Sequence, residues 1–211
     1  MNTPRKDSIM TNRKEEIIQA TLELAAEKGL GTISMQQIAS KVGITKASLY
    51  NHFSSKDEII EAMYETLRSA TSNQAKTKNI DYQKLVENHS LKEVLNIAVG
   101  SYHDMVSDPK LNTFYRIIMS ERTINKSAAE IMVRETETMI NETKTLFCVL
   151  YAKGKADFGN LDMAAFSFAM TIHSIIDYGF DLASAGLKSD NNMIKNYIDE
   201  FCKLYEVKGD K

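Results

Sequence analysis

The chain has 211 residues, 43% of them hydrophobic, with two prolines and nine glycines, and its formal net charge is −2. This composition permits a hydrophobic core and favours long helices over many short strands. The two cysteines, Cys148 and Cys202, do not show the spacing pattern of a disulfide framework, which excludes a disulfide scaffold. The uncharged run 163–176 is shorter than the ~18 residues of a membrane span, which excludes a membrane-spanning protein.

The charges are unevenly distributed along the chain. Residues 1–56 hold eight Lys and Arg against five Asp and Glu, a charge of +3, which leaves 18 against 23, or −5, for the remainder. The N-terminal part could therefore bind phosphate groups by itself, although a chance fluctuation would give the same asymmetry. Residues 1–8 contain no apolar segment of the kind that forms a secretory signal, and we expect a cytoplasmic protein.

Four helices are predicted in the first seventy residues, at about 12–28, 35–42, 46–53 and 56–71. Capping boxes at Ser34–Gln37 and Ser55–Glu58 start the second and the fourth helix, and Thr45 caps the third. Gly29 and Gly43 end the first and the second. Helices of two turns are marginal alone, so the second and third must be held together, as in a helix-turn-helix whose second helix enters the major groove of DNA.

Residues 38–59 resemble the DNA-binding signature of the TetR family of regulators, and the likeness extends over about 13–64. The positions that fall in register are Gly43, Leu49, Tyr50, Phe53 and Lys56. The resemblance implies an all-α fold with an N-terminal three-helix helix-turn-helix DNA-binding domain, 1–56. A fourth helix, to about 71, would connect it to a C-terminal helical ligand-binding and dimerisation domain, 75–211.

The resemblance also implies two sets of DNA-contacting residues. The base edges would be read by Gln36, Lys46, Ala47 and Asn51. The phosphates would be contacted by Ser34, Ser48, Tyr50, His52 and Lys56. Glutamine suits adenine, lysine suits guanine and an alanine methyl suits the thymine methyl, while a solvated helix face is the alternative for each position. Further phosphate or minor-groove contacts, or else a solvated tail, are expected from Arg5, Lys6, Arg13 and Lys14.

The remaining chain is predicted to form helices at about 91–106, 110–121, 127–153, 161–186 and 191–206. Methionine and aromatic residues recur there at helical spacing, which usually indicates core, but the resemblance implies a pocket for a small hydrophobic effector. The candidate pocket residues are Tyr102, Met105, Phe114, Tyr115, Met119, Met139, Phe166, Met170 and His173. The candidate polar anchors are His103, Arg116, His173 and Asp177.

The last two helices, about 161–206, are expected to pair with those of a second copy, as the resemblance implies. The uncharged run 163–176 agrees with this, because a monomer has little reason to bury one helix on all sides. A two-fold homodimer would present two reading heads to a pseudo-palindromic operator in double-stranded DNA.

Signatures of catalysis and of cofactor binding are missing from the sequence. The four histidines are scattered, and neither a metal-binding spacing nor a phosphate-binding loop occurs, so we expect no cofactor, no metal and no enzyme. The favoured interpretation is a ligand-responsive repressor. A protein-interaction or co-activator module on the same fold, without operator reading, is the alternative, and a hydrolase with an unrecognised dyad is a third. The choice between repression and activation stays open.

Overall fold

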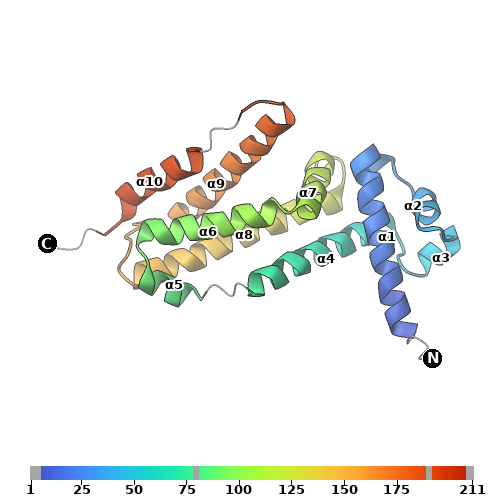
Figure 1. Cartoon of the computed structure of the whole chain (residues 1–211), viewed down its shortest axis with the longest axis horizontal. Coiled ribbons are helices and arrows are strands. Elements are labelled where there is room, and N and C mark those ends of the chain that lie inside the picture. The colour runs from blue at the N-terminus through green and yellow to red at the C-terminus, as the bar shows by residue number, and fades with distance from the viewer. Residues whose placement is uncertain (1–5, 78–80, 189–191, 208–211) are drawn as a thin grey trace. The chain divides into compact units, whose positions relative to one another are not determined.

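The computed structural model is built from helices (Figure 1). It describes residues 6–77, 81–188 and 192–207, with side chains at 13–66, 69, 81–188 and 192–207. Its elements are α1 (Lys6–Lys28), the 3₁₀ turn η1 (Leu30–Thr32), α2 (Met35–Val42), α3 (Lys46–Tyr50), α4 (Lys56–Thr77), α5 (Tyr82–Asn88), α6 (Leu91–Val106), α7 (Pro109–Glu121), α8 (Lys126–Ala152), α9 (Leu161–Ser184) and α10 (Met193–Tyr205). The described residues contain no strand, only one isolated bridge between Ala156 and Glu206, so the all-α fold class is confirmed.

By packing, the chain divides into two compact units. The first comprises Met1–Ala75 and Ser107–Arg134, and the second comprises Lys76–Val106 and Glu135–Lys211. Helix α7 and the start of α8 therefore pack with the N-terminal helices, while the rest of α8 packs with the C-terminal ones. A functional division into 1–56 and 75–211 stays a prediction.

Local capping places the short N-terminal helices where the sequence predicts them. The amide of Gln37 donates to the Ser34 hydroxyl over 3.3 Å, and the amide of Ser34 donates to the Gln37 side chain over 2.8 Å, which completes the predicted capping box. Gly43 ends α2 in the left-handed region at φ 78°, which L side chains rarely adopt. The Thr45 hydroxyl accepts from the amide of Ser48 over 3.1 Å and starts α3.

Several element boundaries differ from the predicted ones. Helix α1 begins at Lys6 rather than near 12, and α3 ends at Tyr50 rather than near 53 because the chain turns directly after it. Two elements, η1 and α5, lie outside the predicted set. Helix α5 is capped by Asp81, whose carboxylate accepts from the amides of Gln83 and Lys84.

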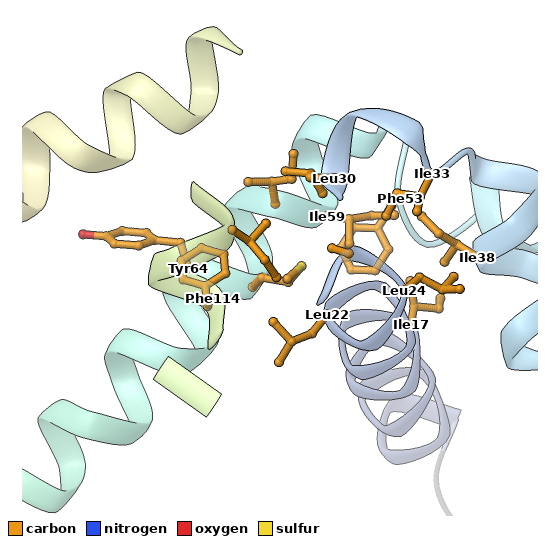
Figure 2. Packing of buried hydrophobic residues seen from close by; sticks show 14 of the residues in the cluster. Ile17, Leu22, Leu24, Leu30, Ile33, Ile38, Phe53, Ile59, Tyr64 and Phe114 are labelled. Atoms are coloured by element: carbon orange, nitrogen blue, oxygen red, sulfur yellow. The ribbon is translucent and has the colours of Figure 1, made fainter. Parts of the chain in front are cut away.

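In the first unit, helices α1, α2, α3 and α4 share one hydrophobic core with α7 and the start of α8 (Figure 2). Ile17, Ile38 and Leu49 have no exposed surface, and Phe53 and Phe114 are 2% and 3% exposed. Burial of side chains of this size contributes roughly 1.5–3 kcal/mol each. The two short helices that lead to the candidate site are thus held from beneath by α1 rather than by their own stability.

An aromatic cluster forms the core of the second unit. Phe147 from α8 stacks on Phe158 with ring centroids 4.3 Å apart, and Phe168 from α9 meets Phe201 from α10 edge-on at 4.7 Å. These pairs add about 0.5–1.5 kcal/mol each beyond the buried area. The cluster fixes α9 and α10 on the end of α8.

Helix α9 has two apolar faces, and only one of them is buried within the single chain. Ala165, Phe168 and Ile172 are buried, whereas Met163 and Phe166 are 56% and 45% exposed. Burial of 163–176 on all sides is therefore not observed in the monomer: the uncharged run also covers an outward face. Within the described residues, none of the helices has the length and apolarity required to cross a lipid bilayer.

The two cysteines should differ sharply in reactivity. Cys148 is exposed on α8, whereas Cys202 on α10 is 5% exposed, and burial raises the pKa of its thiol to about 11. The thiolate is the nucleophile, so at about pH 8 the Cys202 thiol stays protonated and inaccessible. We expect iodoacetamide to add once to the native protein, at Cys148, and twice after denaturation, as measured by intact mass. Equal rates at both residues in the native protein would contradict this burial.

Candidate nucleic-acid interface

Helices α2 and α3 meet through their inner faces and leave a polar outer face. Ile38 and Ala39 from α2 and Leu49 from α3 are fully buried against each other and the core. The left-handed turn at Gly43 reverses the chain between the two helices, and the amide of Ile44 donates to the carbonyl of Ala39 over 2.9 Å. This is a helix-turn-helix, in which the second helix projects a solvent-facing side.

The residues predicted to read base edges all lie on that outer face. Gln36, Lys46, Ala47 and Asn51 are exposed. The Lys46 ammonium lies 5.9 Å from the centroid of the Tyr50 ring, one turn along α3, so the ring supports the lysine by a cation–π contact. An amide, an ammonium and a methyl group are therefore all exposed and available for base contacts.

The residues predicted to contact phosphates are less uniform. Ser34 and Tyr50 are exposed, while Ser48 and His52 are half-buried. The Ser34 hydroxyl already takes part in the capping box of α2. The Nδ1 atom of His52 is buried and lacks a hydrogen-bond partner among the described residues, so contact with a phosphate would have to use its other ring nitrogen.

Lys56 has a role that the sequence did not reveal. Its ammonium donates to the carbonyls of Leu30 over 2.9 Å and Ile33 over 3.3 Å, across the turn between α1 and α2. Lys56 therefore ties the start of α4 to the entrance of the helix-turn-helix. A phosphate contact would have to use its remaining N–H group, and it stays a prediction.

The start of α4 is held by a variant of the predicted capping box. The amide of Glu58 donates to the Ser55 hydroxyl over 3.1 Å, but the Glu58 carboxylate binds one residue earlier than predicted and accepts from the amide and the hydroxyl of Ser54. The hydroxyl and amide of Ser54 lower the pKa of Glu58, and the charge of Lys14 adds to the effect. The lowered pKa favours the ionised carboxylate, which is the form that accepts both hydrogen bonds from Ser54.

The basic residues near the N-terminus have separate surroundings. Arg13 pairs with Glu16 on its own helix over 2.6 Å, and Lys14 lies 5.2 Å from the ring of Phe53. The whole of Arg5 and the side chain of Lys6 lie outside the described residues. Additional DNA contacts by these four residues stay a prediction.

Comparison with known proteins identifies the family. The model of the bacterial regulatory proteins of the tetR family matches residues 17–63. The HTH-type transcriptional regulator YvdT of Bacillus subtilis is 38% identical over 141 residues, which span 59% of this chain and 72% of YvdT. The chain belongs to the TetR family of transcriptional regulators. The HTH-type regulator YerO of the same organism is 29% identical over 69% of this chain, and the match spans 49%, about half, of YerO's own length.

Solved structures of TetR-family proteins share the fold over nearly the whole chain. The flavonoid-responsive regulator FrrA has a TM-score of 0.70 at 21% identity and covers 94% of this chain and 100% of its own. SmeT in complex with triclosan has a TM-score of 0.70 at 14% identity, with 94% and 93% covered. At such identities the likeness shows the fold: an N-terminal helix-turn-helix and a C-terminal helical domain.

In this TetR-family chain the predicted effector residues are divided between the two units. Phe114, Tyr115 and Met119 belong to the first unit. The second unit contains Tyr102, Met105, Met139, Phe166, Met170 and His173. Of the candidate anchors, His103 and Arg116 are exposed, whereas His173 and Asp177 are half-buried.

The structure brings three of these side chains together in the second unit. The Tyr102 hydroxyl lies 2.9 Å from Nδ1 of His173, and Nε2 of His173 lies 3.4 Å from the Asp177 carboxylate. A separate open depression of about 330 Å³ lies over α9 and the start of α10. Its lining consists of Met170, Thr171, Ser174, Ile175, Tyr178 and Met193.

Proposed function

We propose that this TetR-family regulator is a ligand-responsive repressor that binds a pseudo-palindromic operator as a homodimer. The observation that carries the proposal is the outer face of α2 and α3, where Gln36, Lys46 and Tyr50 are exposed above a buried Ile38–Leu49 contact. Base reading needs exposed side chains on helices that are packed onto a core, and the exposure of these residues and the burial of Ile38 and Leu49 support it here. Such a regulator acts in the cytoplasm, by binding rather than by catalysis.

The outward face of α9 supports dimerisation. Met163, Phe166, Met170 and Tyr178 recur at intervals of three, four and eight residues and so follow one side of the helix. Three of them are 45–56% exposed, and Met170 and Tyr178 line the depression over α10. The same face of a second copy would cover this apolar surface in a two-fold interface and set two reading heads on neighbouring half-sites.

The chain of Tyr102, His173 and Asp177 supports a polar anchor for the effector in the C-terminal unit. Half-buried polar groups in a unit whose candidate pocket residues are mostly apolar would give a site with a few fixed hydrogen-bonding groups. SmeT has been solved with triclosan, and FrrA is flavonoid-responsive. By this analogy the effector is a small hydrophobic molecule, and a coupling of about 2 kcal/mol between the two sites would change operator affinity by tens-fold.

Operator binding should depend on Lys46 and Tyr50. We expect Lys46→Ala to cost about 1–3 kcal/mol of binding to the DNA upstream of the chain's own gene, because a lysine–guanine contact is lost. Tyr50→Ala should weaken binding about tenfold, because it removes a phosphate contact and the ring beneath Lys46. Fluorescence anisotropy at several salt concentrations measures both effects.

The matched control is Lys84→Ala, which removes an equal charge from an exposed side chain on α5. This control should bind like the wild-type protein. Lys56→Ala is a poor test of phosphate binding, since it also breaks two hydrogen bonds within the protein. If the Lys46 and Tyr50 variants bind as tightly as Lys84→Ala, the proposed reading face is wrong.

A further inference from the structure

The turn between α1 and α2 is held from two sides by side chains of other helices. On one side, Lys56 at the start of α4 donates to the carbonyls of Leu30 and Ile33. On the other side, the amide of Gly31 donates to Oε1 of Glu121, the last residue of α7, over 3.0 Å. The backbone groups of this short turn thus have partners far along the chain: Lys56 lies 26 positions after Leu30, and Glu121 lies 90 positions after Gly31.

Glu121 fits this place closely. Glu121 is 9% exposed. A Cβ atom added at position 31 would lie 3.2 Å and 3.4 Å from the two carboxylate oxygens of Glu121. A side chain at position 31 would therefore require the Glu121 carboxylate to shift by a few tenths of an ångström. A carboxyl group that is buried without a partner is costly, so the hydrogen bond to Gly31 is what makes Glu121 acceptable at this position.

The turn leads directly into the reading helices. Only two residues separate Gly31 from Ser34, the N-cap of α2, and each residue spans at most ~3.6 Å. A displacement of the Gly31 amide therefore passes into the start of α2, where Gln36 lies, with little slack to absorb it. Through the Gly43 turn it also moves α3, which carries Lys46.

A second contact attaches the same segment of the chain, 107–134, to α4. Arg134 donates from one nitrogen to both carboxylate oxygens of Glu61, over 2.7 Å and 3.0 Å, and lies 4.6 Å from the centroid of the Tyr64 ring. Residues 107–134 join the C-terminal unit at both ends, before α7 and within α8. Helix α7 is therefore linked by chain to the C-terminal unit and by Glu121 to the entrance of the reading helices, and α4 has the same double link through its own chain and Lys56.

We propose that Glu121 is a positioning residue for operator binding, which acts by holding the Gly31 amide and thereby the start of α2. The proposal rests on the proposed function, since it concerns the affinity for an operator. The Glu121 carboxylate accepts from the backbone amide of Gly31, which lies before the reading helices in the chain. It sets the place from which Gln36 and Lys46 reach the groove, and it is the contact by which a movement of α7 would alter that place.

The test compares Glu121→Gln with Glu121→Met. Glutamine keeps an acceptor at Oε1 and should bind the operator within about twofold of the wild-type protein. Methionine has a similar volume but lacks the acceptor, so the Gly31 amide loses its partner and operator affinity should fall at least about tenfold. Fluorescence anisotropy gives the affinities, and circular dichroism and size-exclusion chromatography establish that both variants are folded to the same extent and have the same size. Glu130→Met, at an exposed position on α8, is the matched control.

A double-mutant cycle keeps the proposal testable if Glu121→Met does not fold. Gly31→Ala places a methyl group against the carboxylate, and the second change Glu121→Ala removes that carboxylate. We expect Gly31→Ala to weaken operator binding at least fivefold in the wild-type background and less than twofold in the Glu121→Ala background.

Two results separate the possible failures. If the wild-type protein does not bind DNA with any preference for its operator, the proposed function fails and this inference fails with it. If the wild-type protein binds but Glu121→Met binds equally well, or Glu121→Gln loses as much affinity as Glu121→Met, the inference alone is overturned. Equal effects of Gly31→Ala in both backgrounds would also overturn it.

Discussion

We expect Phe166→Asp to leave the protein monomeric at micromolar concentration and to weaken operator binding at least about 100-fold. Phe166 is 45% exposed on the outward face of α9, within the proposed two-fold interface. In a two-fold interface each substitution occurs twice, so two carboxylates would be desolvated against apolar surface without partners, at a cost of several kcal/mol. A monomer places only one reading head on DNA. It loses the gain in affinity that the second, linked head provides, which is on the order of 10²–10⁴-fold.

Sedimentation velocity and operator anisotropy on the same samples check this expectation. Tyr151→Asp is the control, because Tyr151 is 58% exposed on α8 and lies outside the proposed interface. It should leave both the dimer and the operator affinity unchanged. The monomer itself should stay helical, since Phe166 contributes little to the core of its own chain. A Phe166→Asp protein that sediments as a dimer would place the interface elsewhere.

The features that the sequence predicted are those that depend on near neighbours in the chain. The Ser34–Gln37 box, the Gly43 turn and the Thr45 cap each involve groups within four residues of one another, so their spacing alone indicates the geometry. The inward Ile38 and Leu49 follow from helical periodicity in the same way. These local features position the candidate site, and for that reason its outer face could be predicted.

The features that escaped prediction depend on residues far apart in the chain. No spacing rule connects Lys56 to Leu30, or Glu121 to Gly31. From the sequence alone, Lys56 fits the role of a phosphate contact as well as it fits a hydrogen bond to the backbone of the protein. The packing of 107–134 with the N-terminal helices is likewise decided by Phe114 and Ile118 entering the core of the first unit. Periodicity shows that a face is apolar but gives no information on which helix covers it.

Helix α9 illustrates the same limit at its outer surface. An uncharged run can be apolar on every side, and the sequence then predicts burial without saying by what. Within one chain Phe168 is buried and Phe166 is not, although only two positions separate them. The difference becomes visible once α10 is seen to cover a single side of α9.

Phe147→Ala should lower the free energy of unfolding by about 3–5 kcal/mol, the largest stability loss that we expect from one substitution in this chain. Phe147 has no exposed surface, stacks on Phe158 at 4.3 Å and also contacts the rings of Phe168 and Phe201. Its removal leaves a cavity where α8, α9 and α10 converge, and neighbouring rings in well-packed positions can close it only in part. Urea unfolding followed by circular dichroism, at one fixed protein concentration, measures the change.

Two further variants show whether the loss comes from this packing. Tyr151→Ala removes an aromatic ring one turn further along α8, but that ring is 58% exposed, so the change should stay within about 0.5 kcal/mol. Phe147→Leu loses the ring contacts but keeps more of the apolar volume, so it should cost less than Phe147→Ala. Because the same cluster holds α9 and α10 in place, Phe147→Ala should also weaken the proposed dimer, whereas Tyr151→Ala should not. Equal losses for Phe147→Ala and Tyr151→Ala would mean that the aromatic cluster does not support the C-terminal unit.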